Sequence, residues 1–128
     1  VLTATGAPGA VVLDWAPDQV SIDTTRSAIG MTQAWLELSQ EFNGQRSPIV
    51  LIGSAPTALE SLLDLIIKGA TSPSLIIGMP VGFVGVEQSK LRLVKSNIPY
   101  ILLEGTRGGA GLAAATINAL LRASELSR

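Results

Sequence analysis

The stretch "PIVLIGSAPTALESLLDLIIKGATSPSLIIGM", from Pro48 to Met79, contains the unit that decides the fold. Two short, continuous apolar runs, Pro48–Ser54 and Ser74–Met79, enclose a segment with apolar residues at helical spacing. Apolar runs of this length, bounded by Gly, Ser and Pro, predict buried strands. The segment between them has Pro56 where a first helical turn is expected and Gly69 where the helix should stop. The stretch therefore predicts a strand, a helix and a second strand.

The same alternation continues on both sides of this unit. Strands joined by helices favour right-handed crossovers and a parallel sheet. Because the strand runs are continuous rather than alternating, both faces of the sheet are expected to be covered. The expected fold is a single α/β domain over residues 1–128, a three-layer α/β/α sandwich with a mainly parallel sheet. Further strands are expected at Ala10–Trp15 and Pro99–Gly105, and further helices along the stripe Ala28, Met31, Trp35, Leu38 and Phe42, at Val86–Asn97 and at Gly111–Leu126.

Composition excludes several classes of function. A chain with 47% hydrophobic and 15% charged residues can form a core and is not typical of disorder. The net charge of −1 and the 4% of aromatic residues disfavour a nucleic-acid partner, and no apolar run is long enough to span a membrane. Cysteine and histidine are both absent, so we expect no metal site and a cytoplasmic location.

Three glycine-rich loops should lie where an open parallel sheet binds ligands, beyond the carboxyl ends of its strands. They are Gly53–Thr57, Gly78–Gly85 and Gly105–Gly111. The first loop leads into a helix N-terminus, where free amides and the helix dipole suit a carboxylate or a phosphate. The more common alternative is an ordinary turn in which Ser54 caps the helix.

The other two loops differ in chemistry. The last loop offers Arg107, which can hold a carboxylate with two bonds, and the glycines Gly108 and Gly109, which let backbone approach an anion. It matches neither a P-loop nor a dinucleotide fingerprint, and close packing of the following alanine-rich helix is an equal alternative. The middle loop is apolar, which indicates a surface that meets a large and partly apolar ligand.

Charged residues elsewhere are expected on helix surfaces. Arg26, with Ser27, begins the first long helix, and a solvated arginine is the simpler interpretation at that position. No pair of carboxylates stands out as an acid–base couple. The side chains assigned to exposed helix faces are Glu60, Asp64, Lys90, Arg92 and Lys95.

Four segments together resemble the precorrin-8X methylmutase family, or precorrin isomerases, of cobalamin biosynthesis. They are "TTRSAIGM" (Thr24–Met31), "IGSAPTAL" (Ile52–Leu59), "IIGMPVGFVGVEQSK" (Ile76–Lys90) and "PYILLEGTRGGAGLAAATINAL" (Pro99–Leu120), in the family's order. The resemblance implies an isomerase that moves a methyl group from C-11 to C-12 of precorrin-8X to give hydrogenobyrinic acid. It also implies a three-layer α/β sandwich, a homodimer, no cofactor and a corrinoid tetrapyrrole ligand.

The resemblance implies a substrate site in which helix N-termini and arginines meet carboxylates and the apolar loop meets the macrocycle. Its residues would be Arg26, Ser27, Ser54, Ala55, Pro56, Thr57, Pro80, Val81, Gly82, Phe83, Arg107, Gly108 and Gly109. The family's essential histidine lies earlier in its sequence, whereas this chain has none, so the catalytic residue is unassigned. We therefore expect a C-terminal portion of the family's domain. The alternatives are a non-catalytic tetrapyrrole- or anion-binding module and a general phosphate-binding α/β domain.

Overall fold

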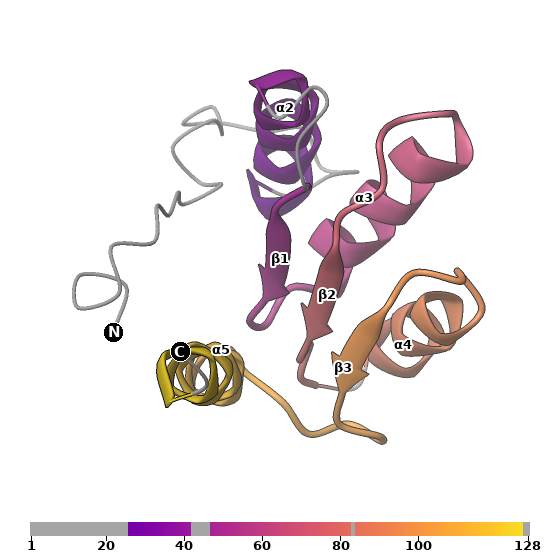
Figure 1. Cartoon of the computed structure of the whole chain (residues 1–128). Coiled ribbons are helices and arrows are strands. Elements are labelled where there is room, and N and C mark those ends of the chain that lie inside the picture. The colour runs from indigo at the N-terminus through magenta and orange to yellow at the C-terminus, as the bar shows by residue number, and fades with distance from the viewer. Residues whose placement is uncertain (1–25, 42–46, 83, 127–128) are drawn as a thin grey trace.

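The computed structural model describes residues 26–41, 47–82 and 84–126 (Figure 1). The helices and strands expected within these ranges are all present, whereas the strand expected at Ala10–Trp15 lies outside the described residues. No described helix is both long enough and apolar enough to cross a membrane. In chain order the elements are α2 (Arg26–Glu41), β1 (Ile49–Ile52), α3 (Pro56–Ile67), β2 (Leu75–Gly78), α4 (Val86–Val94), β3 (Tyr100–Leu102) and α5 (Ala110–Leu126).

The three described strands form a parallel sheet in the order β1–β2–β3, as the sequence predicts. The register pairs Ile52 with Gly78, and Gly78 with Leu102. The last residues of the three strands therefore lie in one row. The loops that follow these strands leave the sheet at the same edge, which we call the carboxyl edge.

Helices α2, α3 and α4 cover one face of the sheet. Helix α3 contributes Leu59, Leu62 and Leu63, which are spaced so that they lie on one helical stripe and are 0–3% exposed. They form the main core with Val50 and Ile52 of β1 and with residues of the neighbouring helices. Each fully buried leucine contributes about 1.5–3 kcal/mol. This core fixes the helix layer against the sheet.

The stripe expected on α2 faces the same core. Met31 and Trp35 are both 3% exposed, and the Trp35 indole nitrogen donates a hydrogen bond to the Thr71 carbonyl at 2.8 Å. Trp35 is therefore covered by the described part of the domain. Phe42 lies outside the described residues.

Among the described elements, only helix α5 packs on the opposite face (Figure 1). Its Ala113 joins Ile77 and Met79 in a second, smaller cluster. One helix does not cover three strands, so Ile49 and Leu51 of β1 are 42% and 40% exposed. The three-layer arrangement is confirmed. The expectation that both faces of every strand are covered is wrong for β1 within the described part of the chain.

The start and end of α3 differ in part from the sequence prediction. Pro56 lies in the first turn and Gly69, with φ of +106°, follows the last turn, as predicted. The N-cap residue is Ala55 instead of Ser54, and no side chain caps the helix. The Ser54 side chain therefore does not satisfy the amides at this helix N-terminus.

Candidate functional site

The three glycine-rich loops meet at the carboxyl edge and are hydrogen-bonded to one another. The middle loop lies between the other two. Its Val81 amide donates to the Ser54 carbonyl at 3.5 Å, and its Gly82 amide donates to the Thr106 carbonyl at 3.0 Å. Segments that are 24 or more residues apart in the sequence thus form one continuous surface.

The closest contact between loops involves Gly108 and Gly109. The Gly109 amide donates to the Met79 carbonyl at 2.6 Å. A Cβ atom at position 108 would lie 2.3 Å from the Met79 oxygen and 2.7 Å from the Pro80 oxygen. The space beside the Gly108 Cα is therefore filled by backbone, so the missing side chain serves close packing of two loops. The idea that this space admits a ligand anion is wrong.

The predicted binding residues differ in their exposure. Ser54, Thr57, Val81 and Arg107 are exposed at the carboxyl edge, whereas Pro80 is fully buried and supports its loop from within. Phe83 lies outside the described residues. The residues of intermediate exposure are Ser27, Ala55, Pro56, Gly82, Gly108 and Gly109.

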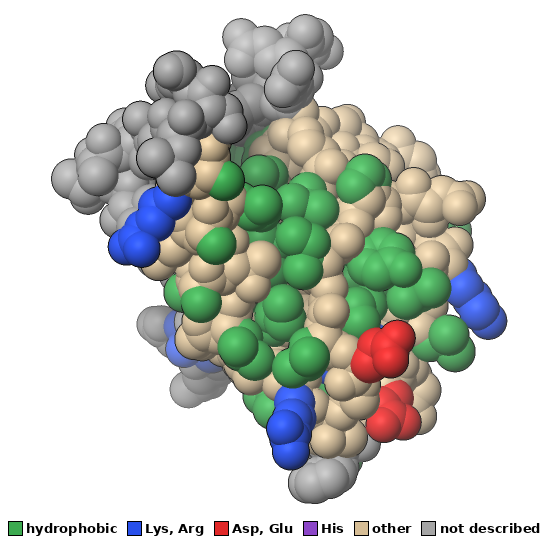
Figure 2. Space-filling model, turned by 60° about the horizontal axis from the view of Figure 1, so that its bottom comes forward, with side chains coloured by type: hydrophobic (Ala, Val, Ile, Leu, Met, Phe, Trp, Pro, Cys, Tyr) green, Lys and Arg blue, Asp and Glu red, His purple; other side chains and the backbone are tan. Residues whose placement is uncertain are grey.

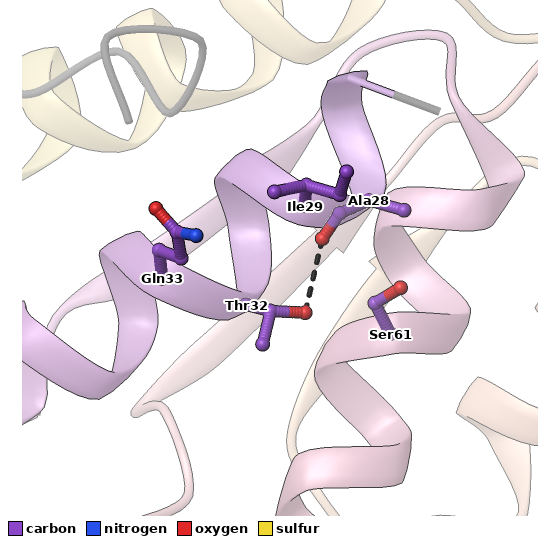
Figure 3. Close-up of a pocket in the computed structure, with 5 residues that line it drawn as sticks. All are labelled: Ala28, Ile29, Thr32, Gln33 and Ser61. Carbon is purple, nitrogen blue, oxygen red and sulfur yellow. Dashed lines mark hydrogen bonds between the residues drawn. The ribbon is translucent and has the colours of Figure 1, made fainter. Parts of the chain in front are cut away.

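Arg26 is exposed at the first residue of α2. Ala28 of α2 and Ser61 of α3 line one open hollow of about 170 Å³, in which Thr32 donates a hydrogen bond to the Ala28 carbonyl at 3.0 Å (Figure 3). Later in α2, Trp35 reaches Thr71, which follows the end of α3. The two helices thus run in the same direction, which places the start of α2, with Arg26, toward the carboxyl edge. The hollow itself lies between the two helices and is separate from the three loops.

Lys90 is the buried residue near this edge that the sequence analysis placed wrongly. It was expected on the surface of a helix, but it is only 4% exposed. Its ammonium nitrogen donates to the carbonyls of Leu103, Gly105 and Arg107 at 2.5, 2.9 and 2.7 Å. The lysine therefore reaches from α4 into the loop between β3 and α5. The available signal of this burial was the spacing of the lysine on its helix. Lys90 lies one residue after the buried Ser89 and three residues before the buried Leu93.

Burial also changes the acidity of Lys90. Loss of water around the ammonium group lowers its pKa below the ordinary value of 10.5, and the Glu87 carboxylate one turn away raises it in partial compensation. The assignment of Lys90 to an exposed helix face gave no reason to expect this lowered pKa. Its three hydrogen bonds match the three donors of the protonated form.

The other charged residues on α3 and α4 are confirmed as surface groups. Arg92 pairs with Asp64 at 2.7 Å and approaches Glu60 at 3.7 Å, which links α4 to α3. These side chains are 34–57% exposed, so the pairs contribute at most about 1 kcal/mol in stability. Lys95 is exposed after the last turn of α4.

The surface near these loops is apolar in its middle and charged at its border. Figure 2 brings forward the end of the molecule where the strands stop, and shows hydrophobic side chains gathered over the middle of that view, with charged side chains around them. Exposed apolar side chains at the carboxyl edge include Val81, Val84 and Leu103, and Leu112 lies in the first turn of α5. Patches of this kind mark binding surfaces for partly apolar ligands or for other proteins.

The helix N-termini at this edge lack side-chain caps at α3 and α4. First-turn amides that no side chain satisfies are suited to carboxylate or phosphate groups. Among the described residues, no cluster of acidic side chains could hold a metal ion. The edge thus combines amides and Arg107 with exposed apolar side chains, and its chemistry fits an anionic ligand that has a large apolar part.

Comparison with known proteins agrees with this arrangement. A profile of the precorrin-8X methylmutase family matches residues 11–123. The precorrin-8X methylmutase of Pseudomonas aeruginosa is 37% identical over 110 residues, which cover 84% of this chain and 53% of the relative. The cobalt-precorrin-8 methylmutase of Methanothermobacter thermautotrophicus is 42% identical over 103 residues, covering 80% of this chain and 47% of the relative.

A solved structure shows the same similarity in three dimensions. The precorrin-8X methylmutase of Thermus thermophilus superposes with a TM-score of 0.65 at 40% identity, covering 78% of this chain and 46% of that protein. The chain thus spans about half the length of the relatives it matches. With a profile match over most of its residues and identities near 40%, the chain belongs to the precorrin-8X methylmutase family.

Proposed function

We propose that this chain forms the tetrapyrrole-binding part of an isomerase that moves a methyl group from C-11 to C-12 of precorrin-8X and so gives hydrogenobyrinic acid. Family membership supports this activity, and the convergence of the three loops at the carboxyl edge supports the location of the site. The proposed site consists of the exposed and half-buried residues of these loops together with Arg26 and Ser27. No cofactor takes part in the proposed reaction, which is placed in the cytoplasm.

The chemistry of the edge suits such a ligand. A corrinoid has an apolar ring with carboxylate side chains around it. Exposed Val81 and Leu103 offer contact to the ring, while Arg107 and the uncapped N-terminus of α3 offer partners for the carboxylates. Charge-assisted bonds from arginine to a carboxylate are roughly twice as strong as neutral hydrogen bonds. The ligand is therefore held by its rim and covered on one face.

Titration with hydrogenobyrinic acid tests this proposal. We expect a saturable change in the visible absorption of the ring when the chain is added. No saturable change would contradict the proposed function. Binding that competes with inorganic phosphate at similar affinity would instead favour a general phosphate-binding domain. Binding without turnover, even when a histidine-bearing segment is supplied, would favour the non-catalytic module.

Substitution of the arginines locates the site within that titration. Arg26→Ala and Arg107→Ala are each expected to weaken binding by about 1.5–3 kcal/mol, the typical contribution of a hydrogen bond to a charged group. Both arginines are exposed, so the melting temperature should hardly change. Arg122→Ala is the matched control, because Arg122 is also exposed but lies about three turns beyond the start of α5. Equal affinity in all three variants would place the ligand elsewhere.

Association into a homodimer is part of the same proposal. Apolar side chains remain exposed on the sheet face that α5 only partly covers, among them Ile49 and Leu51 of β1, and Leu120 of α5 itself. Burial of such surface is the main driving force of protein association. Sedimentation velocity is expected to show a dimer at high micromolar concentration. A monomer over the whole range would contradict this part of the proposal.

A further inference from the structure

The loop between β3 and α5 is hydrogen-bonded to the side chain of Lys90 on helix α4. Along residues 103–109, the carbonyls of Leu103, Gly105 and Arg107 converge on the Lys90 ammonium nitrogen at 2.5–2.9 Å. Alternate carbonyls of one loop thus share a single donor group. An ammonium has three donors, so these three carbonyls use its full capacity.

The same loop is also held from its other side. The carbonyl of Thr106, between two carbonyls that face Lys90, accepts a hydrogen bond from the Gly82 amide at 3.0 Å. The Gly109 amide donates to the Met79 carbonyl at 2.6 Å. The loop is therefore fixed between α4 and the middle loop. The position of Arg107 and the start of α5 follow from this arrangement.

No apolar side chain could replace Lys90 in this role. A methionine has a similar volume and avoids the cost of burying a charge, but it would leave three carbonyls without a donor. The charge has a second effect. The three acceptors are neutral groups, and a buried charge is screened less than an exposed one. The ammonium therefore favours an anion bound against the loop.

We propose that Lys90 is a positioning residue, whose ammonium group sets the conformation of loop 103–109 and thereby the affinity of the site for the carboxylates of its ligand. Lys90 acts through the loop and needs no contact with the ligand. This inference rests on the proposed function for the identity of the ligand. The part of the inference that concerns the order of the loop does not rest on the proposed function, because that order can be measured without a ligand.

Lys90→Met tests the inference, with Lys95→Met as the matched control on the same helix. Both proteins are compared at a temperature at which circular dichroism shows them folded. The affinity of Lys90→Met for hydrogenobyrinic acid should fall about tenfold or more, the factor that one bond to a charged group is worth. Lys95 is exposed, so its variant should bind like the unaltered chain. If a folded Lys90→Met binds with unchanged affinity, Lys90 has only a structural role and the proposal is wrong.

Tryptic cleavage after Arg107 reports the order of the loop without a ligand. Cleavage there, followed by mass spectrometry, should be at least about tenfold faster in Lys90→Met than in Lys95→Met, because cleavage requires a loop that has left its bonded path. Equal rates would overturn the loop part of the inference. If the unaltered chain fails to bind the corrinoid, the proposed function and the statement on affinity both fail, while this measurement still decides whether Lys90 orders the loop.

Rescue by a small amine separates positioning from packing. Lys90→Ala removes the side chain beyond Cβ, and n-propylammonium carries the missing atoms. We expect n-propylammonium to restore both slow cleavage and ligand affinity, and propan-1-ol of similar size to restore neither. Equal rescue by the alcohol would show that the site needs volume only and would overturn the proposal. If Lys90→Met does not fold, Lys90→Arg takes its place, since it keeps the charge and alters only the donor geometry.

Discussion

The substitution Gly108→Ala is expected to destabilise the fold by about 3 kcal/mol and to abolish ligand binding. This loss of stability is at the upper end of the usual range for overpacking, because the added Cβ meets backbone atoms that cannot move aside. The new Cβ would lie 2.3 Å from the Met79 oxygen and 2.7 Å from its carbonyl carbon. Both are backbone atoms at the end of β2, where the Met79 amide is bonded to the Ile52 carbonyl at 2.9 Å. Only separation of the two loops relieves the clash, and this breaks the bond between Gly109 and Met79. Denaturant unfolding measures the loss.

Two other glycines serve as controls for this substitution. Gly111→Ala lies within α5 with no atom near the added Cβ, so it should stabilise the protein by about 0.4–1 kcal/mol. Gly109 has φ of +112°, and an added Cβ would meet only the Gly53 oxygen at an ordinary contact distance of 4.0 Å, so Gly109→Ala should cost about 1–3 kcal/mol through backbone strain alone. A Gly108→Ala variant as stable as Gly111→Ala would show that the two loops are not packed as described.

The 128-residue chain alone is expected to isomerise precorrin-8X more slowly than the same chain supplied with a histidine-bearing segment from a family relative. The expected difference in rate is about 10²–10⁴-fold, which is the usual contribution of general acid–base catalysis. The family resemblance assigns proton delivery to a histidine, and this sequence contains none. Neither Lys90 nor Glu104, at the carboxyl edge, is a suitable substitute. The Lys90 nitrogen is bonded to three carbonyls, and Glu104 is exposed beyond the end of β3.

The change in visible absorption as the ring conjugation is interrupted measures this rate. The segment is added as a fusion ahead of Val1, and the control is the same fusion with its histidine replaced by alanine. Restoration by the first fusion and not by the second is the expected result. Full turnover by the 128-residue chain alone would show that histidine is not required.

Most of the fold could be predicted from local patterns. The strands β1, β2 and β3 are continuous apolar runs, and α3 combines an apolar stripe with Pro56 at its start and Gly69 after its end. Such signals depend only on residues that are close together in the sequence. The incomplete cover over Ile49 and Leu51 could not be predicted in this way, because it depends on how many helices lie on each face.

The site was predictable only in its parts. Glycine-rich loops after parallel strands predicted that the three loops meet, since the carboxyl ends of such strands share one edge. The burial and the hydrogen bonds of Lys90 were not visible, because a lysine on a polar helix is usually exposed and its partners lie 13, 15 and 17 residues further along the chain. The role of Gly108 was likewise hidden, since its neighbour in space is Met79.

The uneven division of the core has a consequence for local unfolding. Of the residues that the structure describes, eleven are buried in the main cluster, whereas three, Ile77, Met79 and Ala113, are buried in the cluster beneath α5. Segments with few buried apolar contacts open at lower free energy than the rest of a protein. Detachment of α5 would also break the bond between Gly109 and Met79, so we expect the C-terminal helix and the loops at the carboxyl edge to open as one cooperative unit. A ligand that bridges the loops would therefore slow the hydrogen exchange of the α5 amides, although the ligand need not touch that helix.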